Sequence, residues 1–528
     1  MKTALQSAKA AVQVLVAVLV LVSPAAAPAS EESPAFVKHI LLFIGDGMQL
    51  THEIAASRYL NGRDDALSFH RLPYRAFVAT WDVTTYDGNA RACSAPAYDP
   101  QGFDPLVGYD PGRGGRMPFP LQPGGVDEAY FNPPPPAAAH AADSASAATA
   151  LATGFKTESG RIAWAPGGSP NGALETIAER LRAQKGFAIG VVSTVPFSHA
   201  TPAAFVSHHV SRSGTREIGA EIIHAFQPEV VIGGGHPGSG QGGRSADYSY
   251  LRREDHAFLK TPGPDNPYEF VERRAGVDGG ERLAAAARSA AAQGRKLFGL
   301  FGGAGGGFES PRPRDLPGAP GVERAAAEDP LLSDAVLAAL TVLGGDPEGF
   351  FAVFEQGGID WANHDNDFRR MVGTVWDLHT AVAAAVDFID RPGDAIDWSN
   401  TLLIVTADHA HARLRLNAVL AAGDLPEQEG RCGDGGPVCT YPGKEVGYHG
   451  TRHTNELVTL YARGGAAAAG CGRAEGLWYP GTRIIDNTQL FHLMAAAAGV
   501  PRKSALAPLP SAAGCPRRPA GRGPLPRR

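Results

Sequence analysis

Short, unbroken apolar segments that end at glycine or at a polar residue constrain the fold of this chain most strongly. They lie at residues 36–44, 187–192, 230–232, 297–301, 350–354 and 401–406. Apolar side chains on both faces of a strand are typical of a parallel sheet that is covered on both sides. Helical apolar spacing between these segments, at 174–184 and 371–388, indicates the covering helices. The sequence therefore predicts an α/β fold, a three-layer α/β/α sandwich around a large, mostly parallel sheet.

Both ends of the chain differ from this central part. A basic start, an apolar run over residues 10–22 and a stretch of small residues predict a signal peptide over residues 1–29. The apolar run is shorter than the roughly 20 residues that a membrane span needs, and no later stretch qualifies. We therefore expect an exported protein, periplasmic or extracellular, with no stable membrane span. Residues 501–528 are basic and Pro-rich, which predicts a disordered tail.

The charge distribution bears on the partners of the protein. The formal net charge is -6 at pH 7, and the basic residues near both ends leave about -15 on residues 28–500. An acidic body argues against nucleic acid as a specific partner. It would also repel anionic substrates, unless a local cationic site such as bound metal ions attracts them.

Two long segments interrupt the pattern of strands. Residues 82–139 are rich in Gly, Pro, Asp and aromatic residues and lack clear periodicity, which predicts a surface insertion that either covers a site or is simply a loop. Residues 237–280 are polar and are expected to lie outside the core. The glycine-rich run at 302–307 suggests a dinucleotide-binding loop, but its spacing is indiscriminate and no helical pattern follows at once, so we reject that interpretation.

Five cysteines in an exported chain suggest oxidised pairs with one cysteine left over. Cys432 and Cys439 are close enough in sequence to close a small loop. Cys471 with Cys515 is the next expected pair, which leaves Cys93 unpaired. No CxxC spacing occurs, so a zinc site built from cysteines is not expected.

The Ala-rich segment 141–154 carries a candidate nucleophile. Asp143 or Ser144 is predicted to cap a helix, which puts Ser144 in the first helical turn. Free backbone N–H groups and the positive end of the helix dipole favour an anion beside that hydroxyl. The same residues also fit a structural helix with a polar cap. Further along, Arg212 offers a guanidinium of the kind that grips phosphate through two N–H groups.

Acidic and imidazole side chains follow several of the predicted strands. Asp360 and His364, at i and i+4, share one face if this turn is helical. Mixed carboxylate and histidine ligands suit zinc, and carboxylate with hydroxyl suits magnesium. Two metals with a serine and an arginine make a phosphoryl-transfer site. The candidate residues are Asp46, Glu355, Asp360, His364, Asp408, His409 and His453.

With these residues in view, the chain resembles the alkaline phosphatase family. The resemblance rests on the motifs LLFIGDGM, ADSASAATALATG, HATPAAFVSHHVSR, FEQGGIDWANH, TADHAHA and RHTNELV, in this order from about residue 38 to 498. It implies a catalytic domain over residues 30–500 that hydrolyses phosphate monoesters to alcohol and inorganic phosphate. It also implies a covalent phosphoserine intermediate, two zinc ions and one magnesium ion.

The resemblance implies a role for each matching residue. Ser144 would be the nucleophile and Arg212 would clamp the phosphoryl oxygens, with Asp143 orienting Arg212. His411 would support a zinc ligand from the second layer of the site. The ligands would be Asp360, His364 and His453 for one zinc ion, Asp46, Asp408 and His409 for the other, and Asp46, Thr201 and Glu355 for magnesium.

Two positions that vary within the family are His199 and Trp361 here. Some members carry Asp and Lys at these positions, so this chain lacks an ammonium group near the phosphate. We therefore expect weaker retention of product phosphate than in members that carry the lysine. The alternatives are a related phosphodiesterase or sulfatase, or a catalytically silent metal- or phosphate-binding protein. The family often forms dimers, but nothing in the sequence identifies an interface, so a homodimer stays open.

Overall fold

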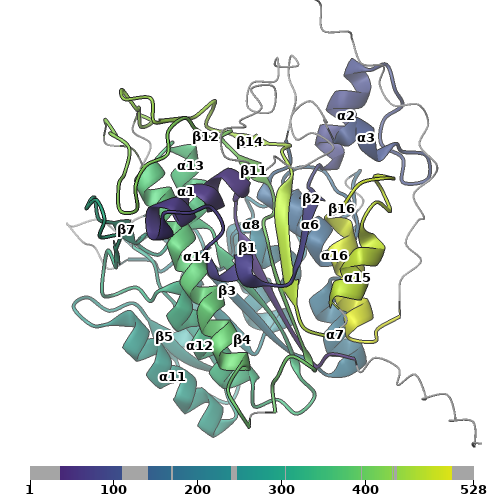
Figure 1. Cartoon of the computed structure of the whole chain (residues 1–528). Coiled ribbons are helices and arrows are strands. Elements are labelled where there is room, and N and C mark those ends of the chain that lie inside the picture. The colour runs from purple at the N-terminus through teal and green to yellow at the C-terminus, as the bar shows by residue number, and fades with distance from the viewer. Residues whose placement is uncertain are drawn as a thin grey trace, which may run out of the picture. The chain divides into compact units, whose positions relative to one another are not determined.

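The predicted apolar segments form strands of one ten-stranded sheet in the computed structural model of the chain (Figure 1). The structure describes residues 36–501, apart from 110–140, 168–169, 239–245, 304, 394, 431, 433–436 and 466. Every strand of the sheet except β15 runs in the same direction. In order across the sheet, the strands are β16 (Ile484–Asp486), β2 (Tyr74–Ala79), β15 (Val458–Arg463), β10 (Thr401–Thr406), β1 (His39–Gly45), β9 (Phe350–Gln356), β3 (Ala188–Pro196), β4 (Val230–Gly234), β6 (Lys296–Leu300) and β5 (Tyr268–Glu272).

Strand β1 lies in the middle of the sheet and determines where a site can form. All seven of its residues are buried, because neighbouring strands cover both edges and helices cover both faces. It pairs in parallel with β10 and β9, and Ile44 lies opposite Thr406 in one and Glu355 in the other. The three strands therefore end together. In open α/β sheets this carboxyl edge is where ligands bind.

Helices cover the two faces of the sheet and confirm the predicted three-layer sandwich (Figure 1). One layer contains α1 (Leu50–Asn61), α11 (Gly279–Gln293), α12 (Leu332–Leu343) and α14 (Phe368–Ile389). The other contains α6 (Ser144–Thr153), α7 (Ile177–Lys185), α8 (Ala200–Val206), α15 (Ala467–Ala474) and α16 (Thr488–Ala497). Among the described residues, α14 is the one helix long and apolar enough to cross a membrane, and its apolar side packs against α12, α1 and β9 as a core helix does.

Short elements connect these layers. The helical ones are η1 (Ser68–Arg71), α2 (Val83–Ala92), α3 (Pro105–Gly108), α9 (Thr215–Ala220), η2 (Glu221–Phe226), α10 (Arg253–Lys260) and α13 (Gly358–His364). The extended ones are β7 (Arg312–Pro313), β8 (Val322–Glu323), β11 (Ala410–His411), β12 (Arg415–Leu416), β13 (Val446–Gly447) and β14 (His453–Thr454).

The first part of segment 82–139 is more ordered than its composition suggests. Helix α2 is capped by Asp82, which accepts a hydrogen bond from the Thr85 backbone N–H at 2.7 Å. Trp81 and Tyr86 belong to a separate small core that reaches Tyr479 beside β16. These aromatic contacts are made with distant parts of the chain, so local periodicity does not reveal them. Residues 110–139 of the predicted insertion lie outside the described part of the chain, as do the predicted signal peptide and all but the first residue of the predicted tail.

Segment 237–280 was wrongly expected to lie outside the core. Its described part contains α10 and β5, and β5 is the edge strand of the main sheet. Asp360 and His364 lie on the short helix α13, which is separate from the helix indicated over residues 371–388. Between the two helices, Asn366 adopts a φ of +53°, and Asp367 caps the start of α14 by accepting a hydrogen bond from the Arg370 backbone N–H at 3.0 Å.

The cysteine pairing differs in part from the expectation. The bond between Cys432 and Cys439 is present, as predicted. The expected pairing of Cys471 with Cys515 is wrong, because Cys471 is a free thiol that is buried in the core on α15. Cys93, which was expected to be the unpaired residue, is disulfide-bonded. Cys471 packs into the main hydrophobic core, and sequence spacing does not show this.

A buried cation, Lys156, connects the small aromatic core around Trp81 and Tyr86 to the main sheet. It leads to a prediction on stability. Lys156 Nζ lies 3.2 Å from Asp486 Oδ2 and donates hydrogen bonds to Trp81 O and Asn487 Oδ1, each at 2.6 Å. Both side chains of the ion pair are at most 1% exposed. Removing one member of a buried pair leaves the other charge uncompensated, which costs roughly 3–5 kcal/mol. We expect Lys156→Met to lower the free energy of unfolding by about that amount in denaturant titrations. The exposed Lys38→Met should change it by less than about 0.5 kcal/mol, and equal effects of the two substitutions would contradict the prediction.

Candidate active site

Acidic and imidazole side chains gather where β1, β10 and β9 end. Asp46 follows β1, and Asp408 and His409 follow β10. Asp360 lies on α13, directly after β9. All four of these side chains are buried. Because parallel register makes the strands end together, residues more than 300 positions apart meet at one edge of the sheet.

Asp46, Asp408 and His409 form the first group. His409 Nε2 lies 3.4 Å from Asp46 Oδ1 and 3.3 Å from Asp408 Oδ2. Asp408 Oδ1 accepts the backbone N–H groups of Gly47 at 3.0 Å and His409 at 2.8 Å, which fixes the carboxylate and turns Oδ2 toward the group. Among the described residues, neither oxygen of Asp46 has a hydrogen-bond donor. Buried carboxylate oxygens without donors indicate a place for a cation.

The second group is centred on the carboxylate of Asp360. The Nε2 atoms of His453 and His411 lie 3.2 and 3.3 Å from Asp360 Oδ1, and that of His364 lies 3.4 Å from Oδ2. His364 Nδ1 donates to Thr451 O and His453 Nδ1 donates to Ala142 O, each at 2.9 Å. A carbonyl can only accept, so in a neutral ring the proton is on Nδ1 and the Nε2 lone pair is free for a metal.

The two groups adjoin, since the rings of His409 and His453 stack with centroids 3.6 Å apart. Glu355, at the end of β9, interacts with both Asp46 and Thr201, which lies on α8. One oxygen of Glu355 accepts a hydrogen bond from Ser193, while Oε1 has no donor among the described residues. The structure therefore brings together all three ligand sets that the sequence suggested. His411 Nε2 lies within 3.3 Å of Asp360 Oδ1, next to the atoms of the second group that could bind a metal.

Burial dominates the electrostatics of these carboxyl groups. It raises the pKa of Asp46 well above its usual range, and that of Glu355 to about 7 and Asp408 to about 6. Burial also acts on Asp360, but the imidazole groups of His364 and His453 beside it hold its pKa well below the usual value. Several carboxylates this close cannot all be charged without positive charge nearby. The site is therefore built to hold cations.

Gly47 shows why the turn after β1 needs a glycine. Its φ is +68°, a conformation that other residues rarely adopt. A Cβ atom there would lie 3.2 Å from both Cα and Oδ1 of Asp360. The turn thus lets α13 approach β1 closely enough for the two groups to meet.

Ser144 is the first residue of α6, and Asp143 is its N-cap. Asp143 Oδ1 accepts the Ser146 backbone N–H at 3.0 Å. Ser144 is 2% exposed, and its Oγ lies 3.2 Å from His409 Nε2. The helix therefore presents this hydroxyl, together with free backbone N–H groups, to the first metal-ligand group.

Arg212 comes from the segment after α8 and lies beside the same helix end. Its Nη1 donates to Asp143 Oδ2 at 2.9 Å, while Nη2 lies 3.5 Å from His199 Nε2. Burial lowers the pKa of His199 to about 3, and the neighbouring Arg212 charge acts in the same direction, so His199 is neutral. Its ring meets Trp361 edge-on, with centroids 6.1 Å apart. One variable position, His199, thus borders the guanidinium, and the other, Trp361, packs against His199.

Asp82 is a residue of this region that the sequence did not suggest. Its Oδ2 accepts hydrogen bonds from Ser146 Oγ and Ser159 Oγ, each at 2.7 Å. Ser146 Oγ also contacts Asp143 Oδ1 at 2.8 Å, so Asp82 supports the capped end of α6 from behind. An N-cap aspartate before a helix is a recognisable pattern, but its contact with α6 is not visible in the sequence.

A further histidine and glutamate group lies away from this site, near β4 and β5. His256 Nε2 and His236 Nε2 lie 2.7 and 3.4 Å from Glu272 Oε2. Lys260 Nζ lies 2.6 Å from Glu272 Oε1, and the Gly238 backbone N–H donates to His236 Nδ1 at 3.1 Å. Donors already occupy both carboxylate oxygens, so a hydrogen-bonded network describes this group adequately.

Comparisons with known proteins agree with this arrangement. The alkaline phosphatase family model matches residues 135–424. The streptomycin-6-phosphate phosphatase of Streptomyces griseus is 30% identical over 525 residues, which cover 92% of this chain and 96% of that protein. Alkaline phosphatase 4 of Bacillus subtilis is 29% identical over 282 residues, or 52% of this chain, so the chain spans about half (50%) of the length of that relative.

A solved structure supports the fold. It is that of a variant alkaline phosphatase from the Antarctic bacterium TAB5, in which aspartate replaces a histidine and Mg is bound in the M3 site. The TM-score is 0.52 at 19% identity, and the match covers 89% of this chain and 100% of that chain. The family model covers more than half of the sequence, and the Streptomyces relative matches nearly the whole chain. The chain therefore belongs to the alkaline phosphatase family.

Proposed function

We propose that this protein hydrolyses phosphate monoesters to an alcohol and inorganic phosphate. The observation that carries the proposal is the position of Ser144 Oγ, 3.2 Å from His409 at the capped end of α6. Arg212 is held beside this helix end by Asp143. A nucleophile, a guanidinium and buried metal-ligand groups at one edge of a sheet are the parts that phosphoryl transfer needs. We also propose that the protein acts after export, on small-molecule esters, and a homodimer stays open.

The buried oxygens without donors on Asp46, Glu355, Asp360 and Asp408 fit metal ions. We propose two zinc ions and one magnesium ion, held by the three ligand sets that the sequence suggested, with His411 close to the Asp360 set. Bound metals would favour the ionised serine and offset charge on the phosphoryl oxygens and on the leaving oxygen. The Mg bound in the M3 site of the TAB5 variant, in which aspartate replaces a histidine, supports a third ion in this fold.

The residues of the chain perform the rest of the chemistry. Ser144 Oγ attacks phosphorus, so an O–P bond to serine forms as the bond to the leaving alcohol breaks, and water then hydrolyses the phosphoserine. Arg212 binds two oxygens of the phosphoryl group through its parallel N–H groups, and Asp143 keeps the guanidinium plane in place. A dianionic monoester gains more from this cation than a monoanionic diester does. This favours a phosphomonoesterase over the phosphodiesterase or sulfatase alternative.

The deciding experiment compares an aryl phosphate monoester with its diester, on protein loaded with zinc and magnesium and on chelator-stripped protein, at alkaline pH. We expect fast turnover of the monoester that is lost on stripping and restored by metal. Preference for the diester would support the phosphodiesterase alternative. If metals bind and neither ester is hydrolysed, the protein is a silent binding protein.

The pair His199 and Trp361 leads to a prediction on product inhibition. Trp361 carries no charge. Product phosphate would therefore contact one cationic side chain fewer here than in family members that have lysine at this position. We expect Trp361→Lys to lower the inhibition constant of inorganic phosphate about tenfold, because a partly buried charge-assisted hydrogen bond adds roughly 1.5 kcal/mol. Trp361→Phe, which keeps an aromatic ring, is the matched control. Steady-state inhibition measures both variants, and an unchanged constant in Trp361→Lys would refute the prediction.

A further inference from the structure

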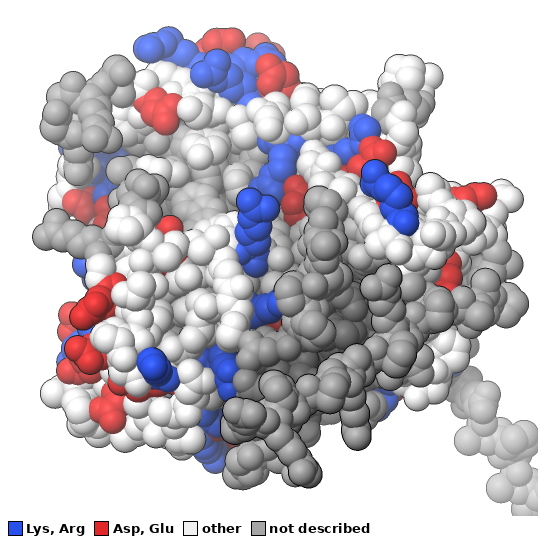
Figure 2. All heavy atoms as spheres, turned by 90° about the horizontal axis from the view of Figure 1, so that it is seen from above, with Lys and Arg blue, Asp and Glu red and all other residues white. Residues whose placement is uncertain are grey.

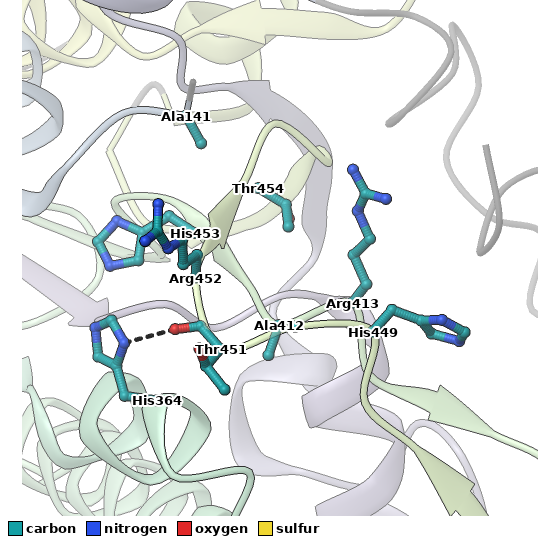
Figure 3. A pocket seen from close by; sticks show the side chains of 10 residues that line it. Ala141, His364, Ala412, Arg413, His449, Thr451, Arg452, His453 and Thr454 are labelled. Carbon is teal, nitrogen blue, oxygen red and sulfur yellow. Dashed lines mark hydrogen bonds between the residues drawn. The ribbon is translucent and has the colours of Figure 1, made fainter. Parts of the chain in front are cut away.

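A pocket of about 600 Å³ opens beside the second metal-ligand group. Figure 3 shows His364 and His453 on one side of this pocket and Arg413 and His449 on the other. Ser144 adjoins the first metal-ligand group, so in-line displacement at phosphorus would put the leaving oxygen toward the second group and this pocket. Its lining residues include Ala141, Ala412, Arg413, His449, Thr451 and Arg452.

Two arginines of this pocket have no partner for their charge among the residues that the structure describes. Arg413 is half-buried and Arg452 is exposed. Within the ranges that the structure describes, neither guanidinium forms an ion pair or a side-chain hydrogen bond, although many other arginines of the chain do. Seen from the edge of the sheet where the site lies, Lys and Arg side chains are exposed near the middle of this face, and most Asp and Glu side chains lie toward its periphery (Figure 2). An acidic protein thus presents unpaired cations beside its site.

The backbone that carries Arg413 is held in an uncommon conformation. Ala412 and Arg413 adopt φ values of +58° and +47°, so two successive residues other than glycine are left-handed. Such residues cost of order 1–3 kcal/mol each and persist only where their surroundings enforce them. Here the Ala412 N–H donates to Arg452 O at 2.9 Å, and the His449 N–H donates to Ala412 O at 3.0 Å. These bonds join the two loops and fix the backbone that carries both arginines. In Figure 3 the Arg452 side chain lies on the same side of the pocket as His453, and the Arg413 side chain lies on the opposite side.

We propose that Arg413 and Arg452 form a subsite for a second anionic group on the substrate. The preferred class would be phosphate monoesters whose alcohol part carries a further phosphate or carboxylate. The inference rests on the proposed function, since it concerns the leaving-group side of the same site. The subsite would also offset the repulsion that an acidic body imposes on a highly charged substrate. A cationic leaving group would meet two guanidinium groups and bind less well.

Three esters with the same four-carbon chain test this subsite on the metal-loaded protein. They are butane-1,4-diol bisphosphate, butyl phosphate and 4-aminobutyl phosphate, whose far ends are anionic, uncharged and cationic. We expect kcat/KM to fall in that order. Counted per phosphate group, the bisphosphate should exceed butyl phosphate about fivefold, because partly exposed charge pairs contribute up to about 1 kcal/mol each. Raising the salt concentration should reduce this ratio, since exposed charges are screened.

The double variant Arg413→Gln, Arg452→Gln should bring the ratio of bisphosphate to butyl phosphate close to one. Arg288→Gln, an exposed arginine on α11, is the control and should leave the ratio as in the unchanged protein. A ratio of one in the unchanged protein, or an unaltered ratio in the double variant, would overturn the subsite while butyl phosphate is still hydrolysed. Failure to hydrolyse any of the three esters would instead refute the proposed phosphatase activity.

Discussion

Removing the metals is expected to abolish phosphate monoester hydrolysis and to lower the melting temperature by roughly 10 °C at pH 8, because ligands that bind only the folded state stabilise it by several kcal/mol. Without cations, the carboxylates of Asp46, Asp408 and Glu355 are buried together, and nothing offsets their mutual repulsion except Arg212 and the histidines. The loss of stability should therefore depend on pH.

The sign of this dependence follows from the raised pKa values. In the metal-free fold burial raises the pKa to about 7 for Glu355 and about 6 for Asp408, against ordinary values of 4.5 and 3.8. At pH values between the unfolded and the folded pKa of each group, the folded protein binds more protons than the unfolded chain. Its free energy of unfolding is therefore retained near pH 4 and falls as the pH rises through 6 and 7. In the loaded protein the cations balance these charges, so the loss should be absent.

Thermal melts of loaded and stripped protein at pH 5.5 and 8 measure this effect. We expect the difference between the two melting temperatures to be larger at pH 8. Stripped protein to which zinc and magnesium are returned should recover both its stability and its activity, which controls for damage by the chelator. Equal differences at the two pH values would show that the carboxyl groups do not titrate in this range.

The sequence allowed the central strands and most of the candidate site to be predicted. Strands β1, β10 and β9 are buried on both faces and appear as unbroken apolar runs, so the polar residues that follow them could be placed at one edge of the sheet. The edge strand β5 was missed because two of its five residues are buried, which leaves it looking polar. Strand β2 was also missed, because Arg75 interrupts its apolar pattern.

Features that depend on tertiary contacts could not be predicted. The left-handed backbone at Ala412 and Arg413 is enforced by hydrogen bonds with residues about 40 positions later, and no local pattern announces it. The position of Asp82 behind α6 and the burial of Cys471 are of the same kind. His411 shows how far the sequence prediction reaches. The sequence suggested that His411 supports a metal ligand, but only the fold shows that its Nε2 lies 3.3 Å from Asp360 Oδ1.

Ser144→Ala is expected to lower kcat/KM for a phosphate monoester by about 10³-fold or more, since removing a covalent nucleophile costs at least this much. The hydroxyl lies at the start of α6, so its loss leaves the N-cap contact from Asp143 to Ser146 intact, and the variant should melt within about 2 °C of the unchanged protein. Arg212→Ala removes a guanidinium but no nucleophile, and a smaller loss of about 10²-fold to 10³-fold is expected.

Acid quenching with radiolabelled substrate separates these two roles. The unchanged protein and Arg212→Ala should retain up to one labelled phosphate per chain, since both form the phosphoserine, whereas Ser144→Ala should retain none. Thr153→Ser, at the far end of the same helix, controls for general effects on α6, because its hydroxyl bonds to Thr149 O and not to the site. Label that persists in Ser144→Ala would assign the nucleophile to another residue. Activity that persists without label would mean that water attacks the ester directly, and the proximity of Ser144 Oγ to His409 would then be structural.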